Sequence, residues 1–313
     1  MEVYEYEMKS GISRTKEFEK KGLAAYAVNC GLKCGHGCTY CSTGAMLRTH
    51  KAFKKLGLNP FGNGYAIVDP DTPQRIIRDA CRKRSRGLIQ LCTTVDPYSP
   101  EAQQYNIGRQ CLLVILSQRG WTVRILTKNA AVANDFDIIE IEPDRVLLGM
   151  SITATPDKAE IISVIEPNAS SIPERIAVMK QAHERGFRTY GMFCPLLPGI
   201  ADSADHIEQL IKTAVEFRAE EIFVEPVNPR GTGLKLTQQA LVDNGYPDEA
   251  AAIEDIRTQK GWSQYTTRLI SNVQRSVRML YDINCLRFLL YSSRLTEADI
   301  TRIRRDDAGI VWL

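Results

Sequence analysis

The chain alternates short apolar runs with amphipathic runs six times, and this alternation limits the fold more than any other feature of the sequence. The apolar runs are rich in Val, Ile, Leu and aromatic residues, as buried parallel strands should be. We predict six strands, at residues 23–30, 87–94, 122–128, 145–153, 187–195 and 221–227. Because helical patterns lie between them, the sequence predicts a parallel sheet with right-handed crossovers.

The strand pattern also suggests how the chain is divided. After about residue 240 the strand patterns stop, and the remaining sequence has helical periodicity. We therefore predict an N-terminal segment at residues 1–22, a strand–helix core at 23–240 and a helical C-terminal extension at 241–313. Periodicity leaves open whether the core is an open sheet or a curled partial barrel.

Charge and the N-terminal sequence exclude several classes of protein. Lys and Arg number 40 and Asp and Glu 37, so the net charge is +3, which argues neither for nor against a nucleic-acid partner. Residues 1–22 are charged throughout and do not form a signal peptide, and no apolar run is long enough to span a membrane. Nine cysteines without a secretion signal indicate a reducing compartment, so we expect a cytoplasmic protein.

Four cysteines crowd into one loop directly after the first predicted strand. They are Cys30, Cys34, Cys38 and Cys41. In parallel α/β folds the reactive groups lie at the carboxyl ends of the strands, so this loop is expected at the functional edge. All four, with His36 nearby, could hold a zinc ion. Without Cys30, three thiolates on a compact loop instead suit a [4Fe–4S] cluster with one iron left open, and we favour the cluster over zinc.

The last three cysteines resemble a family signature. The pattern CxxxCxxC with Tyr40 just before its last cysteine is similar to that of the radical S-adenosylmethionine (SAM) superfamily. Further segments resemble the spore photoproduct lyase-like branch of that superfamily and follow in its order. They are TTVDPYSPEA (93–102), LTKNA (126–130), SITATPD (151–157), IEPNASSIPERI (165–176) and CPLLPGIAD (194–202). The resemblance covers about residues 22–235 and implies a partial (β/α)6 TIM-like barrel followed by the helical extension.

This resemblance implies a radical enzyme with two cofactors, a [4Fe–4S] cluster and SAM. Cys34, Cys38 and Cys41 would be the cluster ligands, and the open iron would bind the amino and carboxylate groups of SAM. Reduction would cleave SAM to a 5′-deoxyadenosyl radical that abstracts hydrogen from a substrate, while the protein supplies position and a dry cavity. A reducing partner of the flavodoxin or ferredoxin type is therefore expected.

The resemblance also implies residues that contact SAM. Lys128, at the end of the third predicted strand, would pair with the SAM carboxylate. Ser151 matches a position near the methionine moiety, and Tyr40 would pack against the cluster or the adenine. Each has a plainer alternative, which is a solvated lysine, an ordinary strand serine and a core aromatic residue.

One family element is missing after the second predicted strand. Many radical SAM enzymes hold the SAM amino group there with a Gly-Gly-Glu sequence, which this chain lacks. Thr93, Thr94 or Asp96 would have to supply the acceptors, and we favour Thr94 and Asp96. An extra residue relative to the family, Val95, leaves open which of them does so.

Cys92 and Tyr98 are the candidate catalytic residues. Spore photoproduct lyases carry a Cys-Thr-Ser-Asp sequence at the end of this strand, and its Cys returns a hydrogen atom to the product radical. CTTVD (92–96) is similar, and the weak S–H bond of Cys92 suits that role. The alternative is a buried strand cysteine. Glu166 and Arg175, in another segment of the resemblance, are expected to form an internal ion pair.

The substrate is left open by the sequence. Basic clusters at residues 48–55 and 75–87 would suit a phosphate backbone, and four arginines lie further on, at 268, 275, 278 and 287. Such clusters are more often solvated surfaces. Three hypotheses follow: a radical SAM enzyme that repairs or modifies nucleic acid, a radical SAM enzyme that acts on a peptide or small metabolite, and a non-catalytic zinc-binding module.

Overall fold

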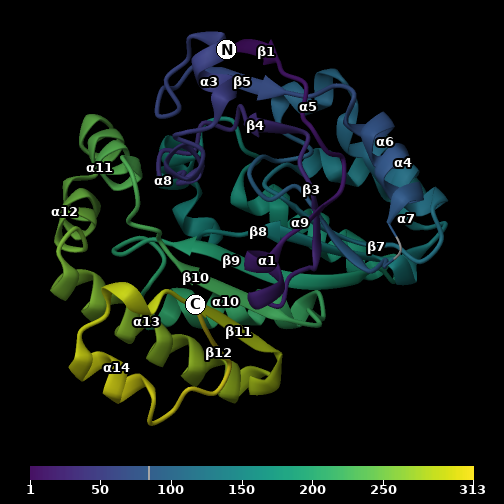
Figure 1. Cartoon of the computed structure of the whole chain (residues 1–313). Coiled ribbons are helices and arrows are strands. Elements are labelled where there is room, and N and C mark those ends of the chain that lie inside the picture. Colours follow the sequence, from purple (N-terminus) through teal and green to yellow (C-terminus); the bar gives the residue numbers. More distant parts are fainter. Residues whose placement is uncertain (84) are drawn as a thin grey trace.

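The computed structural model describes residues 1–83 and 85–313 (Figure 1). Within these residues the main sheet has nine strands in the order β12-β11-β10-β9-β8-β7-β6-β3-β2. Their bounds are β2 Ser13–Arg14, β3 Tyr26–Val28, β6 Leu88–Leu91, β7 Thr122–Thr127, β8 Val146–Ser151, β9 Arg188–Leu196, β10 Ile222–Pro226, β11 Leu286–Leu290 and β12 Ile310–Trp312. All neighbours pair in parallel except β2 and β3, which are antiparallel.

The six predicted strands are confirmed as β3, β6, β7, β8, β9 and β10. In the sheet these six strands lie side by side in the same order as in the sequence. Each crossover therefore joins adjacent parallel strands, as the strand–helix alternation predicts. The sheet is open rather than closed, because β2 and β12 form its two edges. Arg84, which belongs to the second basic cluster of the sequence, lies outside the described residues.

Helices follow the strands and cover one face of the sheet (Figure 1). The α-helices are α1 Lys16–Lys20, α2 Thr43–Met46, α3 Lys51–Leu56, α4 Thr72–Arg82, α5 Pro100–Gln104, α6 Ile107–Ser117, α7 Phe136–Ile139, α8 Ala159–Ile165, α9 Ile172–Glu184, α10 Ala204–Glu216, α11 Gly233–Asp243, α12 Pro247–Asp255, α13 Gln259–Leu280 and α14 Glu297–Ile303. None of the helices in the described residues is both long enough and apolar enough to cross a bilayer.

Alternate side chains of each strand point to opposite faces of the sheet, which divides the core in two. In β9, Phe193 belongs to the large cluster beneath the helices, whereas Tyr190 and Met192 belong to a small cluster on the other face. That small cluster also contains Leu147 and Phe223 from the neighbouring strands. The second face is therefore only partly filled by side chains, and this is the face on which a pocket opens.

A second, smaller sheet was not predicted. Its order is β1-β5-β4, with β1 at Glu2–Glu5, β4 at Gly31–Lys33 and β5 at Tyr65–Val68. β4 begins immediately after Cys30, so the cysteine loop leaves the main sheet through a strand of the small one. These strands have only three or four residues each, and they come from separate parts of the chain. A periodic pattern of apolar residues cannot be recognised in segments this short.

The prediction that strands stop near residue 240 is wrong. β11 and β12 extend the sheet in parallel beyond β10, although helices α11 to α14 make up most of this C-terminal part (Figure 1). The sequence of β11, LRFLL, directly follows the 22-residue helix α13 and a short turn, so it reads as a continuation of the helical pattern. The proposed boundaries at residues 22 and 240 stay a prediction.

Candidate functional site

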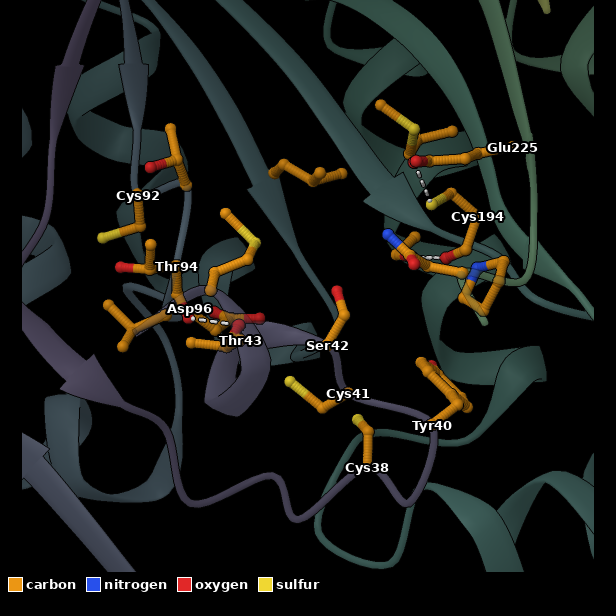
Figure 2. Close-up of a pocket in the computed structure, with 18 of the residues that line it drawn as sticks. Cys38, Tyr40, Cys41, Ser42, Thr43, Cys92, Thr94, Asp96, Cys194 and Glu225 are labelled. Atoms are coloured by element: carbon orange, nitrogen blue, oxygen red, sulfur yellow. Dashed lines mark hydrogen bonds between the residues drawn. The ribbon is translucent and has the colours of Figure 1, made fainter. Parts of the chain in front are cut away.

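A pocket opens at the carboxyl ends of the parallel strands (Figure 2). Its walls are the carboxyl-terminal residues of β7 to β11 and the segments that follow β6, β7, β10 and β11, together with the cysteine loop and α1. Among the residues that line it are Cys34, Cys38, Tyr40, Cys41, Cys92, Thr94, Asp96, Lys128 and Ser151. The structure therefore brings together all the predicted site residues except Tyr98.

The cysteine loop owes its path to two glycines and to contacts with distant segments. Gly37 has φ of +68°, a left-handed conformation that favours glycine, and a side chain on Gly35 would meet the ends of the Met1 and Glu101 side chains. The Gly35 amide donates to Glu101 Oε2 at 2.9 Å, and the Asn168 side-chain amide donates to the Gly35 carbonyl at 2.9 Å. The loop is thus fixed by residues from α5 and from the segment after α8.

Three of the four loop cysteines face the pocket, and the fourth does not. Cys34 and Cys38 are half-buried and Cys41 is exposed, and all three line the pocket. Cys30 is only 2% exposed, and its sulfur lies 3.4 Å from that of Cys92. The set Cys34, Cys38 and Cys41 therefore separates from Cys30 in space, as the spacing suggested.

The three pocket-lining thiols fit a [4Fe–4S] cluster in number and kind. Burial, followed by the charges of Cys41 and Cys38, raises the pKa of Cys34. Burial raises the pKa of Cys38 to about 12. Within residues 1–83 and 85–313, no three or more His, Cys, Asp or Glu side chains are grouped closely enough to hold a metal ion.

His36, the remaining candidate zinc ligand, is turned toward a carboxylate. It is 1% exposed, and its Nδ1 lies 3.4 Å from Asp96 Oδ2. Burial lowers the pKa of His36, and the positive charges of Lys128 and Arg175 lower it further, against the opposing effect of Asp96. The imidazole is therefore neutral near pH 7 and bridges the cysteine loop to the segment after β6.

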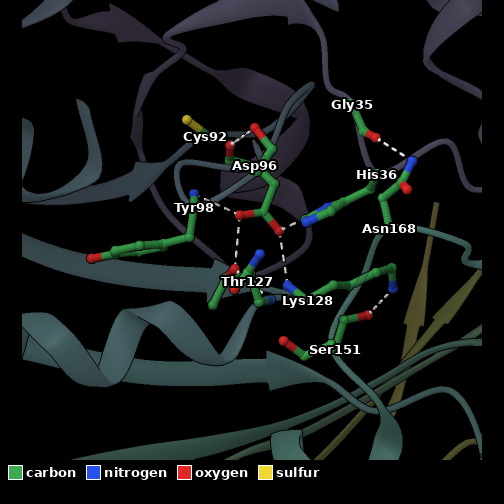
Figure 3. Close-up of polar contacts among 12 residues, drawn as sticks. Gly35, His36, Cys92, Asp96, Tyr98, Thr127, Lys128, Ser151 and Asn168 are labelled. Atoms are coloured by element: carbon green, nitrogen blue, oxygen red, sulfur yellow. Dashed lines mark hydrogen bonds and ion pairs between the residues drawn. The ribbon is translucent and has the colours of Figure 1, made fainter. Parts of the chain in front are cut away.

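Asp96 joins three segments through its carboxylate (Figure 3). Its Oδ1 accepts hydrogen bonds from the Thr127 hydroxyl at 2.7 Å and the Tyr98 amide at 2.8 Å. Its Oδ2 accepts from the Lys128 amide at 2.8 Å. Because both carboxylate oxygens accept hydrogen bonds from these segments, Asp96 fixes the ends of β6 and β7 relative to one another. We assign it this role in addition to the predicted one, which is to accept a hydrogen bond from the SAM amino group.

Thr94 is held by a residue that the sequence did not single out. Asn29, at the end of β3, accepts through Oδ1 from the Thr93 amide at 2.7 Å and from the Thr94 amide and hydroxyl at 3.0 Å each. The Thr43 hydroxyl donates to the Thr94 carbonyl at 3.2 Å. The segment after β6 is therefore anchored to β3 on one side and to α2 on the other, with Thr94 in the pocket wall.

Glu166 is the centre of a buried polar network. It is 2% exposed and forms an ion pair with Arg175, as predicted from the sequence, and it accepts hydrogen bonds from the hydroxyls of Tyr40 and of Thr153, the latter at 3.0 Å. Lys128 Nζ lies 3.5 Å from it. Burial alone would raise the pKa of Glu166, but the charges of Lys128 and Arg175 outweigh burial and lower the pKa to about 2.

This network holds Lys128 at the pocket wall (Figure 3). Lys128 Nζ donates to Ser151 Oγ at 2.5 Å and to the Cys194 carbonyl at 3.4 Å, and lies 5.7 Å from the centre of the Tyr40 ring. Ser151 Oγ in turn donates to the Cys194 carbonyl at 2.6 Å. The Lys128 side chain is 14% exposed, so it is largely desolvated, yet it lines the pocket.

Cys92 and Tyr98, the two candidate catalytic residues, have different surroundings. Cys92 lines the pocket and has φ of 64°, a left-handed conformation that is uncommon for a residue with a side chain. Tyr98 is buried, and its hydroxyl donates to Asp135 Oδ2 at 2.9 Å, beside the helical layer. The structure therefore places Cys92 at the pocket and Tyr98 behind it.

The pocket also contains residues that the sequence did not reveal. They are Lys21, Cys194, Glu225, Arg230 and Tyr291. Cys194 and Glu225 lie at the carboxyl ends of predicted strands, so their position along the strand was a usable signal. Lys21 and Tyr291 come from segments outside the family resemblance, and nothing in the local sequence indicates that they meet.

Comparisons with known proteins found distant sequence relatives and solved structures with a similar fold. No protein-family model matches the chain. An uncharacterised protein of Acidianus two-tailed virus is 27% identical over 225 residues, which is 69% of this chain and 71% of that protein. An uncharacterised protein of Mycobacterium tuberculosis is 25% identical over 211 residues, or 66% of this chain. The match spans 60% of the mycobacterial protein's length.

Solved structures of spore photoproduct lyase superimpose on most of the chain. A variant with bound SAM and dinucleoside spore photoproduct has a TM-score of 0.61 at 13% identity, covering 89% of this chain and 79% of that one. Another variant has a TM-score of 0.60 at 14% identity over the same shares. The predicted resemblance is thus confirmed for the fold: this chain has the α/β fold of spore photoproduct lyase, with the pocket at the carboxyl ends of its strands.

Proposed function

We propose that the protein is a radical SAM enzyme of the spore photoproduct lyase-like type. The observation that carries the proposal is the convergence of Cys34, Cys38 and Cys41 with Lys128 and Ser151 on one pocket. When bound, the [4Fe–4S] cluster and SAM together supply a 5′-deoxyadenosyl radical that takes hydrogen from a substrate. The three thiolates would hold the cluster, and the pocket would limit the access of water to the reactive species.

Lys128 is the residue best suited to bind the carboxylate of SAM. Its ammonium group donates to Ser151 and lies 3.5 Å from Glu166, so it offers a positioned donor at the pocket wall. Tyr40 lines the same pocket, with its hydroxyl bonded to Glu166 and the Lys128 ammonium 5.7 Å from the centre of its ring, and its packing against the cluster or the adenine stays a prediction. Cys92 would return hydrogen to a product radical.

The test of this proposal is SAM cleavage. Protein reconstituted anaerobically with iron and sulfide and reduced with dithionite should convert SAM to 5′-deoxyadenosine, measured by chromatography and mass spectrometry. Iron and sulfide analysis gives the cluster content of the same sample. A colourless protein with stoichiometric zinc and no 5′-deoxyadenosine would instead support the zinc-binding module.

Replacing Lys128 by methionine should weaken SAM binding. A hydrogen bond to a charged group contributes about 1.5–3 kcal/mol, so the Kd should rise about 10-fold to 100-fold. Calorimetric titration of the reconstituted protein with SAM measures this change. Lys54→Met, on the exposed side of α3, is the matched control and should leave the Kd unchanged. Equal affinities for both variants would remove Lys128 from the SAM site.

We further infer that the protein is cytoplasmic, takes electrons from a flavodoxin or ferredoxin type of partner, and acts on nucleic acid. Two observations support the substrate. One of the structural relatives contains a dinucleoside photoproduct, and the basic segment 48–55 directly follows the pocket-lining Met46. The C-terminal arginines contribute less, because Arg268 and Arg278 are paired with Asp202 and Asp306.

Binding to nucleic acid should therefore depend on salt and on the segment 48–55. Affinity for single- and double-stranded oligonucleotides, measured by fluorescence anisotropy, should fall steeply between about 50 and 200 mM salt. Replacing Lys51, Lys54 and Lys55 by alanine should reduce the slope of this dependence. Absent or salt-insensitive binding would favour a peptide or small metabolite as the substrate.

A further inference from the structure

Besides Cys92 and the three proposed cluster ligands, the pocket contains the thiol of Cys194, on the wall that faces Cys92. It lies at the carboxyl end of β9, whereas Cys92 follows β6, and β7 and β8 separate the two strands in the sheet. Figure 2 shows the two sulfurs on opposite sides of the pocket, with Cys41 and Ser42 between and below them. A molecule bound in the pocket would therefore have one thiol on each side.

The backbone of Cys194 is held by the residues that we assign to SAM. Its carbonyl accepts hydrogen bonds from Ser151 Oγ at 2.6 Å and from Lys128 Nζ at 3.4 Å. Cys194 is therefore adjacent to the position where the cofactor would bind. It also belongs to a strand rather than to a loop, because β9 pairs with both of its neighbours, β8 and β10.

The sulfur of Cys194 is hydrogen-bonded to a carboxylate, and the residue also packs against the small apolar cluster on this face of the sheet. Its sulfur donates to Glu225 Oε2 at 3.0 Å, and Glu225 lines the same pocket from β10. Burial raises the pKa of the Cys194 thiol, Glu225 raises it further, and Lys128 and Lys21 only partly oppose this effect. The sulfur therefore keeps its proton near pH 7, and only an S–H group can give up a hydrogen atom.

The surroundings of Cys92 differ in a way that matters for hydrogen transfer. Cys92 is 4% exposed and its sulfur lies against that of Cys30 at 3.4 Å, whereas Cys194 is half-buried and has no other sulfur as a hydrogen-bond partner in the described residues. Cys194 is thus the more accessible of the two thiols from the pocket.

From this geometry, and resting on the proposed function, we propose that Cys194 is a hydrogen-atom donor to carbon radicals formed in the pocket, from the side opposite to Cys92. The S–H bond of Cys194 breaks, a C–H bond forms on the radical, and a thiyl radical remains on the sulfur. One electron from the reducing partner and one proton from solvent restore the thiol. Glu225 keeps the sulfur protonated and in place at the pocket wall.

Deuterium transfer tests this role without knowledge of the substrate. The reconstituted protein is incubated with SAM and dithionite in D2O, in the absence of other thiols, and the 5′-deoxyadenosine is analysed for deuterium on carbon. Thiol hydrogens exchange with D2O and carbon-bound hydrogens do not, so a deuterated product reports transfer from an exchangeable group such as S–D. Cys194→Ala should lower the deuterated fraction of the 5′-deoxyadenosine several-fold.

The control is Cys111→Ala, a buried position in α6 outside the pocket, which should leave both the yield and the deuterated fraction unchanged. A deuterated fraction that is the same in Cys194→Ala as in the parent protein would overturn the role of Cys194. Absence of any 5′-deoxyadenosine from the parent protein would overturn the proposed function instead, so the two failures are distinct.

A second measurement uses the protein without cofactors. Alkylation by iodoacetamide, followed for each cysteine by peptide mass spectrometry across a pH series, should modify Cys194 faster than Cys92 at high pH. Because the Glu225 charge opposes ionisation of the thiol, Glu225→Gln should shift the alkylation profile of Cys194 to lower pH and leave that of Cys111 unchanged. A profile that does not shift, or a Cys194 that is less accessible than Cys92, would contradict the proposal.

Discussion

Replacing Cys34, Cys38 or Cys41 by alanine should abolish both cluster assembly and the conversion of SAM to 5′-deoxyadenosine, whereas Cys30→Ala should retain both. The three cysteines line one pocket, so loss of any one leaves the cluster with two protein ligands. Cys30 is buried away from them, with its sulfur 3.4 Å from that of Cys92. Its removal deletes one small buried side chain and no ligand.

The measurements are the iron and sulfide content after anaerobic reconstitution, the absorbance of the cluster, and the yield of 5′-deoxyadenosine. Cys30→Ala serves as the matched control, since it changes the same residue type in the same loop. Cluster loss in Cys30→Ala together with cluster retention in Cys34→Ala would show that the ligand assignment is wrong. Zinc binding that needs all four cysteines would support the zinc alternative.

Replacing Arg175 by alanine should lower the free energy of unfolding by about 3–5 kcal/mol, the usual cost of removing one partner from a buried ion pair. Arg175 and Glu166 are almost fully buried, and without Arg175 the Glu166 carboxylate keeps Lys128 as its one ion-pair partner among the described residues. Urea denaturation of the cofactor-free protein measures the change. Arg257→Ala is the matched control, because the pair of Arg257 with Glu254 is about half exposed on both sides and should contribute about 0–1 kcal/mol.

A conservative double variant separates charge from volume. Glu166→Gln combined with Arg175→Met removes both charges and keeps the approximate size of the side chains, so it should be less destabilised than Arg175→Ala. If the single and double variants unfold at the same urea concentration, the loss comes from packing, and the unpaired carboxylate is not the cause.

The same ion pair sets a dependence of stability on pH. The pKa of Glu166 is about 2 in the folded protein and has an ordinary value of 4.5, so the folded state favours the charged form. Its contribution is fully present above pH 4.5 and is lost as the pH falls from 4.5 toward 2. Glu166→Gln should therefore lose less stability than the parent protein over this interval, with a difference on the order of 3 kcal/mol. Equal losses in both proteins would contradict the depressed pKa.

Much of the fold could be predicted because it depends on local patterns. The six core strands are continuous apolar runs, and the hydrophobic pattern alone distinguishes them from the amphipathic segments between them. β11 was missed because its five residues come just after a long helix and a short turn and are few enough to fit either pattern. The small sheet was missed because its strands are brief and come from separate parts of the chain.

The sequence by itself determined which residues reach the functional edge. The carboxyl ends of parallel strands share one side of the sheet, so Cys92, Lys128 and Ser151 had to lie near the loop that follows the first strand. The cysteine loop favoured a cluster held by three cysteines but left a zinc site with all four open. The assignment of Cys34, Cys38 and Cys41 as ligands rests on the family resemblance and stays a prediction.

Only the tertiary structure decided which side chains meet within that edge. Tyr98 turns to Asp135 behind the pocket, and Cys194 meets Glu225 inside it. Lys21, from the N-terminal segment, and Tyr291, from the end of β11, complete the same wall. The physical reason is that the order of strands in the sheet and the rotamer of each side chain are set by packing between residues far apart in the chain, which periodicity within one segment does not encode.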